Sequence, residues 1–132
     1  MPRKRSRTMT EAEQRLMDVL WDKGEATVGE ISEALPKRLG LAYNTVLTTM
    51  RILEEKGYVS HTKPDQRRAF IYHPRVARTV ARRRAVREIL RRFFDHSHEA
   101  LVLSILQDED IDERKRKRIR ELLVQFDREL KP

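Results

Sequence analysis

Apolar side chains recur every three or four positions in two short segments near the start of the chain, a spacing that predicts amphipathic helices. The first segment begins at Thr10, which has its capping-box partner at Glu13, and ends at Gly24. The second begins at Thr27 with the same arrangement and stops at Pro36. The pattern therefore predicts two capped helices joined by a short turn.

A third helix is expected over residues 43–56, with Gly57 as its end. Val46, Met50 and Leu53 fall within a narrow arc of this helix, so they are expected to face the core. The opposite arc has short polar groups and one arginine instead of the usual mixture of Glu and Lys. We expect it, with the first residue of the helix, to face outward: Tyr43, Asn44, Thr45, Thr48 and Arg51.

Two short strands follow, at residues 58–62 and 69–73, and Pro74 closes the unit. The turn between them is rich in positive charge, with Lys63, Arg67 and Arg68. Three helices followed by a hairpin with a basic tip are the arrangement of a winged helix-turn-helix. We expect this domain over residues 10–74, after a basic disordered arm at residues 1–9.

Residues 75–132 differ in kind, because three further helices are expected there: an arginine-rich one over about 76–95, one over 97–107 and a last one capped by Asp112. The expected fold class is thus mainly α with one small β hairpin. A helical segment of this size rarely buries enough apolar surface alone. Pairing of two copies would bury it; the alternative is that these helices fold back onto the head. The predicted dimer core is Val80, Ile89, Phe93, Leu101, Val102, Ile105, Leu122 and Phe126.

The charge balance favours an anionic partner. Charged residues make up 38% of the chain, the net charge is +8 and the pI is about 10.2. There is no cysteine, which excludes disulfides, zinc fingers and thiolate metal sites. No apolar run reaches the length of a membrane span and the basic N-terminus lacks a signal-peptide core, so a cytoplasmic location is expected.

The outward arc of the third helix is suited to the major groove of DNA, where an Asn can pair with adenine, a Thr can contact a thymine methyl group and an Arg can read guanine. The basic turn would bind phosphates and provide affinity that depends on salt. The predicted DNA-binding residues are Tyr43, Asn44, Thr45, Thr48, Arg51, Lys63, Arg67 and Arg68. The alternative for the helix is a solvated polar face, and the alternative for the turn is a charged loop that guards an exposed sheet edge. The corresponding rival function is a winged-helix module that interacts with protein and does not bind DNA.

A second alternative is a metal-sensing regulator that uses His96 and His98. These residues have no cysteine and no clear carboxylate partner, so no metal site is predicted. Ser97 beside His98 lacks an oriented acid and an oxyanion loop, and no glycine loop could cradle a phosphate. The sequence therefore predicts neither an enzyme nor a cofactor.

Four blocks of the chain resemble the penicillinase-repressor family of the BlaI/MecI type: residues 10–21, 45–58, 70–74 and 100–103. The resemblance covers about residues 9–130. It implies a winged-helix head, a helical dimerisation tail and repression at palindromic operators. It also implies that Thr45 and Thr48 touch DNA, because they match positions that do so in the family.

The same resemblance implies a way to release the DNA. In members that respond to β-lactams, a membrane metalloprotease sensor triggers cleavage of the tail between Asn and Phe. The aligned pair here is Ser104 and Ile105, which departs from that pattern. The copper-responsive branch uses a C-terminal cysteine cluster, and its mode of sensing is excluded here because the chain has no cysteine.

Overall fold

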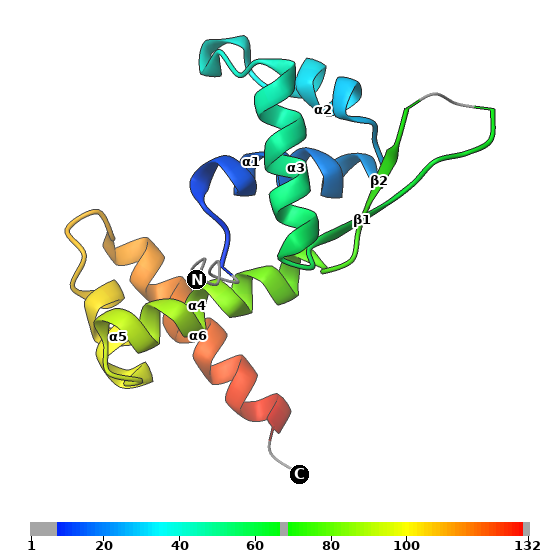
Figure 1. Cartoon of the computed structure of the whole chain (residues 1–132). Coiled ribbons are helices and arrows are strands. Elements are labelled where there is room, and N and C mark those ends of the chain that lie inside the picture. The colour runs from blue at the N-terminus through cyan, green and yellow to red at the C-terminus, as the bar shows by residue number, and fades with distance from the viewer. Residues whose placement is uncertain (1–7, 67–68, 131–132) are drawn as a thin grey trace. The chain divides into compact units, whose positions relative to one another are not determined.

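The computed structural model describes residues 8–66 and 69–130 and divides into two compact units, Met1–Glu88 and Ile89–Pro132 (Figure 1). The first contains three helices, a hairpin and most of a fourth helix. The second contains the end of that helix and two more. Each unit is described by itself below.

The first two helices are α1 (Glu11–Lys23) and α2 (Val28–Ala34), and both begin with the predicted capping box. The amide of Glu13 donates to Thr10 Oγ1 at 3.2 Å, and the amide of Glu30 donates to Thr27 Oγ1 at 3.1 Å. These local bonds satisfy backbone groups that a helix start would leave open. The basic turn after Pro36 contains a short 3-10 helix, η1 (Lys37–Leu39).

The third helix, α3 (Tyr43–Glu55), packs against α1 and α2. Its buried residues are Val46, Met50 and Leu53, as the periodicity predicted. Gly57 follows with a φ of 85°, a left-handed conformation that glycine adopts without strain. Aliphatic residues of all three helices form the core with the buried rings of Tyr58 and Tyr72.

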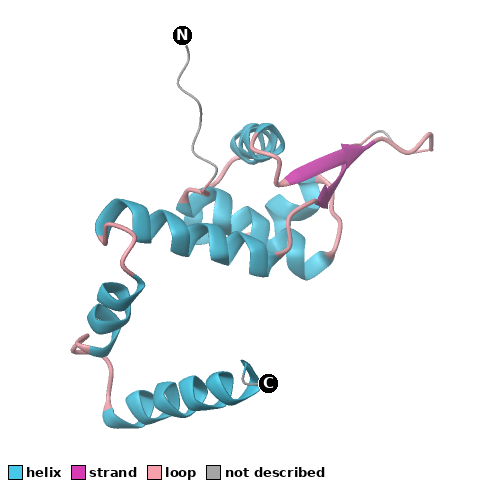
Figure 2. Cartoon of the chain, turned by 90° about the horizontal axis from the view of Figure 1, so that it is seen from below, coloured by secondary structure: helices cyan, strands magenta, loops and turns pink. Residues whose placement is uncertain are grey.

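The hairpin consists of β1 (Val59–Thr62) and β2 (Ile71–Pro74), which pair antiparallel with His61 opposite Tyr72. Figure 2 shows it projecting beyond the helices of the first unit. The second strand begins two residues later than the sequence predicted. The sequence also missed a bridge in which the backbones of Ala26 and Tyr72 exchange hydrogen bonds of 3.1 and 2.8 Å. A bridge of one residue has no alternating pattern by which it could be found.

The fourth helix, α4 (Arg78–Phe93), starts on the surface of the first unit. The indole Nε1 of Trp21 donates to the carbonyl of Val76 at 2.9 Å. The Arg78 guanidinium lies 3.0 Å from Asp22 and stacks over the Trp21 ring. Val76 and Ala81 belong to the core of the head. The first turns of α4 are therefore attached to the winged-helix core.

The second unit contains α5 (His98–Leu106) and α6 (Glu113–Leu130). Side chains cap both helices: the amide of Ala100 donates to Ser97 Oγ at 3.1 Å, and the amide of Lys115 donates to Asp112 Oδ1 at 2.8 Å. The second of these caps was predicted. Among the helices that the structure describes, none is long and apolar enough to span a lipid bilayer.

Candidate nucleic-acid interface

The outward side of α3 presents the residues that were predicted to read DNA. The side chains of Tyr43, Asn44, Thr45, Thr48 and Arg51 are all exposed. The opposite side of the helix is held by the core, so the outward groups stand on a rigid support. The structure thus brings Asn44, Thr45, Thr48 and Arg51 to one side of the helix, whereas Tyr43 is exposed at its start, on the side of Met50. Contact of all five with DNA stays a prediction.

The hydroxyl groups of two threonines on α3 bond to the helix itself. Thr48 Oγ1 donates to the carbonyl of Asn44 at 2.9 Å, and Thr49 Oγ1 donates to the carbonyl of Thr45 at 2.7 Å. Thr48 is exposed, whereas Thr49 is half-buried. With its proton engaged, Thr48 offers an incoming ligand an acceptor oxygen and a methyl group.

The start of α3 lacks the side-chain cap that α1 and α2 have, because its N-cap residue is Ala42. The first backbone hydrogen bond of the helix runs from the amide of Val46 to the carbonyl of Ala42. Open amides at a helix start favour negative charge. Lys37 and Arg38 are exposed in the turn before this helix. The sequence marked that turn only as basic, so these two residues were missed as candidates.

The wing, defined here as residues 59–74, is joined to the end of α3 by His61. Its Nδ1 atom contacts the carboxylate of Glu54, and its ring lies 4.6 Å from the ring of Phe70. The Lys63 ammonium lies 5.6 Å from the centre of the same Phe70 ring. A chain of contacts therefore runs from α3 to Lys63. The other two basic residues predicted at the tip, Arg67 and Arg68, lie outside the described residues.

Tyr72 lies beneath this junction, with a side chain that is almost fully buried. Burial, and then the negative charge of Glu54, raise the pKa of Tyr72, while the positive charge of Arg51 acts in the opposite direction. The hydroxyl group therefore stays neutral beneath α3 at physiological pH.

A buried ion pair fixes the other end of α3. Lys56 Nζ lies 2.9 Å from Glu13 Oε2 and also donates to the carbonyl of Thr8 at 3.1 Å. The side chains of Lys56 and Glu13 are only 7% and 4% exposed. Glu13 thus caps α1 and also holds the C-terminal end of α3. The sequence identified only the cap, because 43 positions separate the partners.

Large apolar side chains of the tail are exposed in the single chain. Phe93 is 70% exposed and Phe126 is 60% exposed. The other exposed members of the predicted dimer core are Val80, Ile89, Val102, Ile105 and Leu122, while Leu101 is half-buried. Nine positions separate Val80 from Ile89, which places them on opposite sides of α4. Val80 therefore does not share the face of Ile89 and Phe93.

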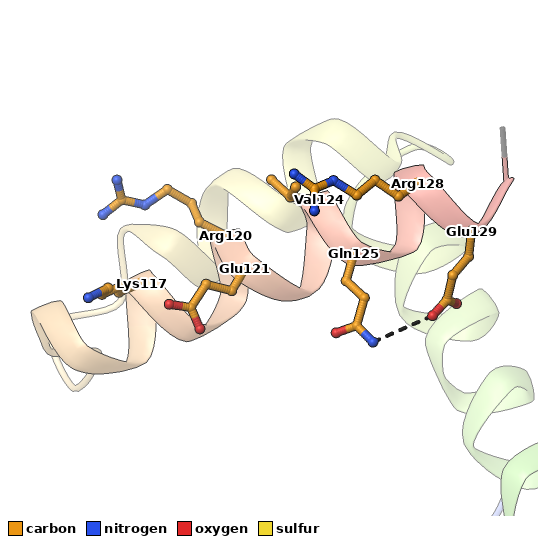
Figure 3. A pocket seen from close by; sticks show the side chains of 7 residues that line it. All are labelled: Lys117, Arg120, Glu121, Val124, Gln125, Arg128 and Glu129. Carbon is orange, nitrogen blue, oxygen red and sulfur yellow. Dashed lines mark hydrogen bonds between the residues drawn. The ribbon is translucent and has the colours of Figure 1, made fainter.

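The polar side of α6 borders an open hollow of about 670 Å³ around Val124 (Figure 3). Charged side chains surround Val124, and Gln125 donates to Glu129 within the same helix at 3.4 Å. All of the lining residues belong to this one helix. The hollow is therefore an open helix face and not an enclosed ligand site.

Two further predictions concern α5 and its start. Ser104 and Ile105 belong to the helical segment α5, and the side chains of both are exposed to solvent. Within the described part of the chain, no group of three or more His, Cys, Asp or Glu side chains is placed to hold a metal ion. His96 and His98 thus form no such cluster there.

Three helices and a hairpin, with an exposed polar third helix, define a winged helix-turn-helix protein. The chain belongs to the penicillinase repressor family, whose model matches residues 9–125. This confirms the resemblance seen in the sequence. Because the family is one of repressors, its membership also confirms that the chain is not an enzyme.

Among curated proteins, the chain is similar to the transcriptional regulator BlaI of Mycobacterium tuberculosis (strain H37Rv), with 41% identity over 63 residues. That stretch is 47% of this chain and spans 44% of the relative. Among solved structures, it is similar to the DNA-binding domain of the repressor BlaI, with 26% identity, a TM-score of 0.49 and coverage of 58% and 92% of the two chains. The chain is also similar to the structure of the CopR repressor, with 34% identity and a TM-score of 0.45. That match covers 53% of this chain and 99% of the CopR chain.

Proposed function

We propose that this protein is a homodimeric transcriptional repressor that binds a palindromic DNA operator. The observation that carries the proposal is the outward side of α3, where exposed short polar side chains and one arginine stand on a helix whose other side is buried. Such a surface allows the backbone to approach the base edges of the major groove closely. Membership in the penicillinase repressor family supports the same conclusion.

Each part of the head has a separate role in this proposal. Asn44, Thr45, Thr48 and Arg51 enter the major groove, with Tyr43 at its edge. Lys63, together with Arg67 and Arg68, binds phosphates beside it. Base contacts select the sequence, whereas phosphate contacts fix the position of the head and make its affinity depend on salt.

Dimerisation is supported by the apolar side chains that the tail leaves exposed. On α6, Leu122, Phe126 and Leu130 recur every four positions, so they lie along one side of the helix. An exposed apolar stripe of this kind is typical of a surface that a partner covers. A second copy of the chain covers this stripe and places two heads about a two-fold axis, which matches a palindrome.

The sharpest test of DNA reading is Thr48→Val, which keeps the shape of the side chain and removes its acceptor oxygen. We expect each half-site to lose about 1–3 kcal/mol, so a dimer with two changed heads should lose about 2–6 kcal/mol, a fall in operator affinity of roughly 30-fold or more. Binding to DNA of unrelated sequence should not change. Fluorescence anisotropy with labelled duplexes measures both affinities, and sedimentation checks that the oligomeric state is the same.

The matched control is Thr49→Val. It removes a hydroxyl group that bonds the backbone in the same way but is half-buried. This variant should bind the operator as the wild type does. Equal affinities of the wild type and Thr48→Val would overturn the assignment of Thr48, and equal losses in both variants would indicate an effect on the helix.

The proposal includes release of the DNA by proteolysis at Ser104–Ile105, triggered by a membrane metalloprotease sensor. Both residues are exposed, which supports access, but they are helical, so α5 must open locally before a protease can cut. Mass spectrometry of the repressor after co-expression with such a sensor tests this. A cut at another bond, or none, would contradict it.

A further inference from the structure

Most of the net charge of the chain lies on a single helix. α4 contains seven arginines and one glutamate, a net charge of +6, whereas the whole chain has a net charge of +8. The elements proposed to read DNA therefore do not account for the basic character of the protein. A helix with such an excess of arginine favours contact with a polyanion.

Some of these arginines have roles within the head. Arg78 pairs with Asp22, and Arg84 stacks over the ring of Tyr58 at 5.4 Å. Arg83 and Arg87, in contrast, are exposed and form no ion pair within the part of the chain that the structure describes. They lie four positions apart, so their guanidinium groups share one side of the helix and repel each other.

This side of α4 differs from the side that the proposed dimer would cover. The exposed apolar residues Val86, Ile89 and Phe93 lie on one side of the helix. At 100° per residue, Arg87 lies at least about 100° around the helix from each of them, and Arg83 at least about 60°. The two arginines would therefore remain accessible when the apolar stripe pairs with a second copy.

We infer that Arg83 and Arg87 form a second phosphate-binding surface, which contacts the DNA backbone beyond the half-site that α3 reads. This inference rests on the proposed function, which brings a polyanion to the same unit. Arg84, beside them, stacks on Tyr58, whose amide bonds the carbonyl of Leu53 at the end of α3. The segment of α4 that contains the two arginines is thus connected through Arg84 to the end of the proposed recognition helix.

A rival partner is the acidic segment at residues 108–112 of a second copy. It is less suited to the arginines because two of its carboxylates already have local partners. Asp108 Oδ1 accepts a bond from the amide of Asp110, and Asp112 Oδ1 accepts one from the amide of Lys115. Phosphates along a duplex have no such competing bonds and recur at close spacing.

The test compares the wild type with the double variant Arg83→Gln and Arg87→Gln on two duplexes. One is the minimal operator, obtained by selection from a random library. The other is the same operator extended by about 12 base pairs on each side, roughly one more helical turn. Affinity is measured over a range of salt concentrations. The control replaces Arg114 and Lys117, two exposed residues of α6, with Gln, so it removes the same charge elsewhere.

Affinity for the extended duplex is plotted as the logarithm of the binding constant against the logarithm of the salt concentration. For the variant, the slope of this line should be shallower by about 0.9 for each phosphate contact that is lost, and by up to about 3.6 for the four arginines of a dimer. On the minimal operator, the variant should bind as the wild type does. An unchanged slope on the extended duplex, or an equal loss in the control, would overturn the inference and leave the proposed function intact. Dissociation of the variant into monomers would favour the acidic segment instead. Failure of the wild type to prefer any operator would overturn the proposed function, and the inference with it.

Discussion

The buried ion pair between Glu13 and Lys56 predicts a large effect from a small change. Glu13→Gln keeps the length of the side chain and can still serve in a capping box, so it removes only the charge. Lys56 then keeps its ammonium group in a site where its side chain is 7% exposed, with the carbonyl of Thr8 as a remaining acceptor. Removal of one partner of a buried pair costs about 3–5 kcal/mol. Because that acceptor remains, we expect about 3 kcal/mol, out of a typical total stability of about 5–15 kcal/mol.

Urea unfolding followed by tryptophan fluorescence measures this loss in the head. Trp21 is the only tryptophan of the chain, and its indole bonds the carbonyl of Val76 within the first unit. For a unit of this size, the free energy of unfolding falls by about 1 kcal/mol per molar urea. The unfolding midpoint of Glu13→Gln should therefore lie about 3 M below that of the wild type.

Glu11→Gln is the matched control, because it breaks an ion pair on the same helix. Glu11 Oε1 lies 2.7 Å from Arg15, but the two side chains are 81% and 44% exposed. Exposed pairs contribute about 0–1 kcal/mol, so its midpoint should hardly move. In addition, Glu13→Gln combined with Lys56→Met should cost less than the sum of the two single changes. If Glu13→Gln unfolds at the midpoint of Glu11→Gln, the buried pair does not stabilise the head.

Two further predictions concern the tail and the residue beneath α3. Phe93→Asp places a charge on an exposed apolar side chain of the proposed dimer seam and should give monomers in sedimentation, so a retained dimer would remove Phe93 from that seam. The raised pKa of Tyr72 means that its hydroxyl group keeps its proton to higher pH in the folded state than in the unfolded one. The unfolded chain then loses this proton first, so stability should fall as the pH rises above about 10. Tyr72→Phe should lessen this alkaline loss in unfolding experiments, and an identical loss in both proteins would contradict the role of Tyr72.

The features predicted correctly from the sequence are those that depend on neighbouring residues. Thr10 with Glu13 and Thr27 with Glu30 are three positions apart, and their bonds form wherever the helix starts. The buried side of α3 follows from its periodicity, because Val46, Met50 and Leu53 recur with the helical repeat. From these local signals alone, the order of the elements and the exposed side of α3 could be predicted.

The features that the sequence missed join distant parts of the chain. Ala26 meets Tyr72 across 46 positions, and Lys56 meets Glu13 across 43. Neither contact has a local pattern, since each depends on how the helices pack. The assignment of Val80 to the dimer core stays a prediction, and its position on α4, opposite to that of Ile89, means that the two residues cannot lie on the same side of the helix.

The same contacts bear on how affinity and specificity are divided in the proposed repressor. The buried core and the Glu13–Lys56 pair hold α3 in place, so the backbone that carries its short polar side chains needs no ordering when DNA binds. A single head of this kind still makes few base contacts. Linking two heads raises the overall affinity by about 10²–10⁴ without any new contact, provided that both reach their half-sites. Sequence choice would therefore come from the outward side of α3. Most of the affinity would come from phosphate contacts and from the pairing of the exposed apolar tail, so a change at Phe93 should weaken operator binding more than the loss of any single base contact.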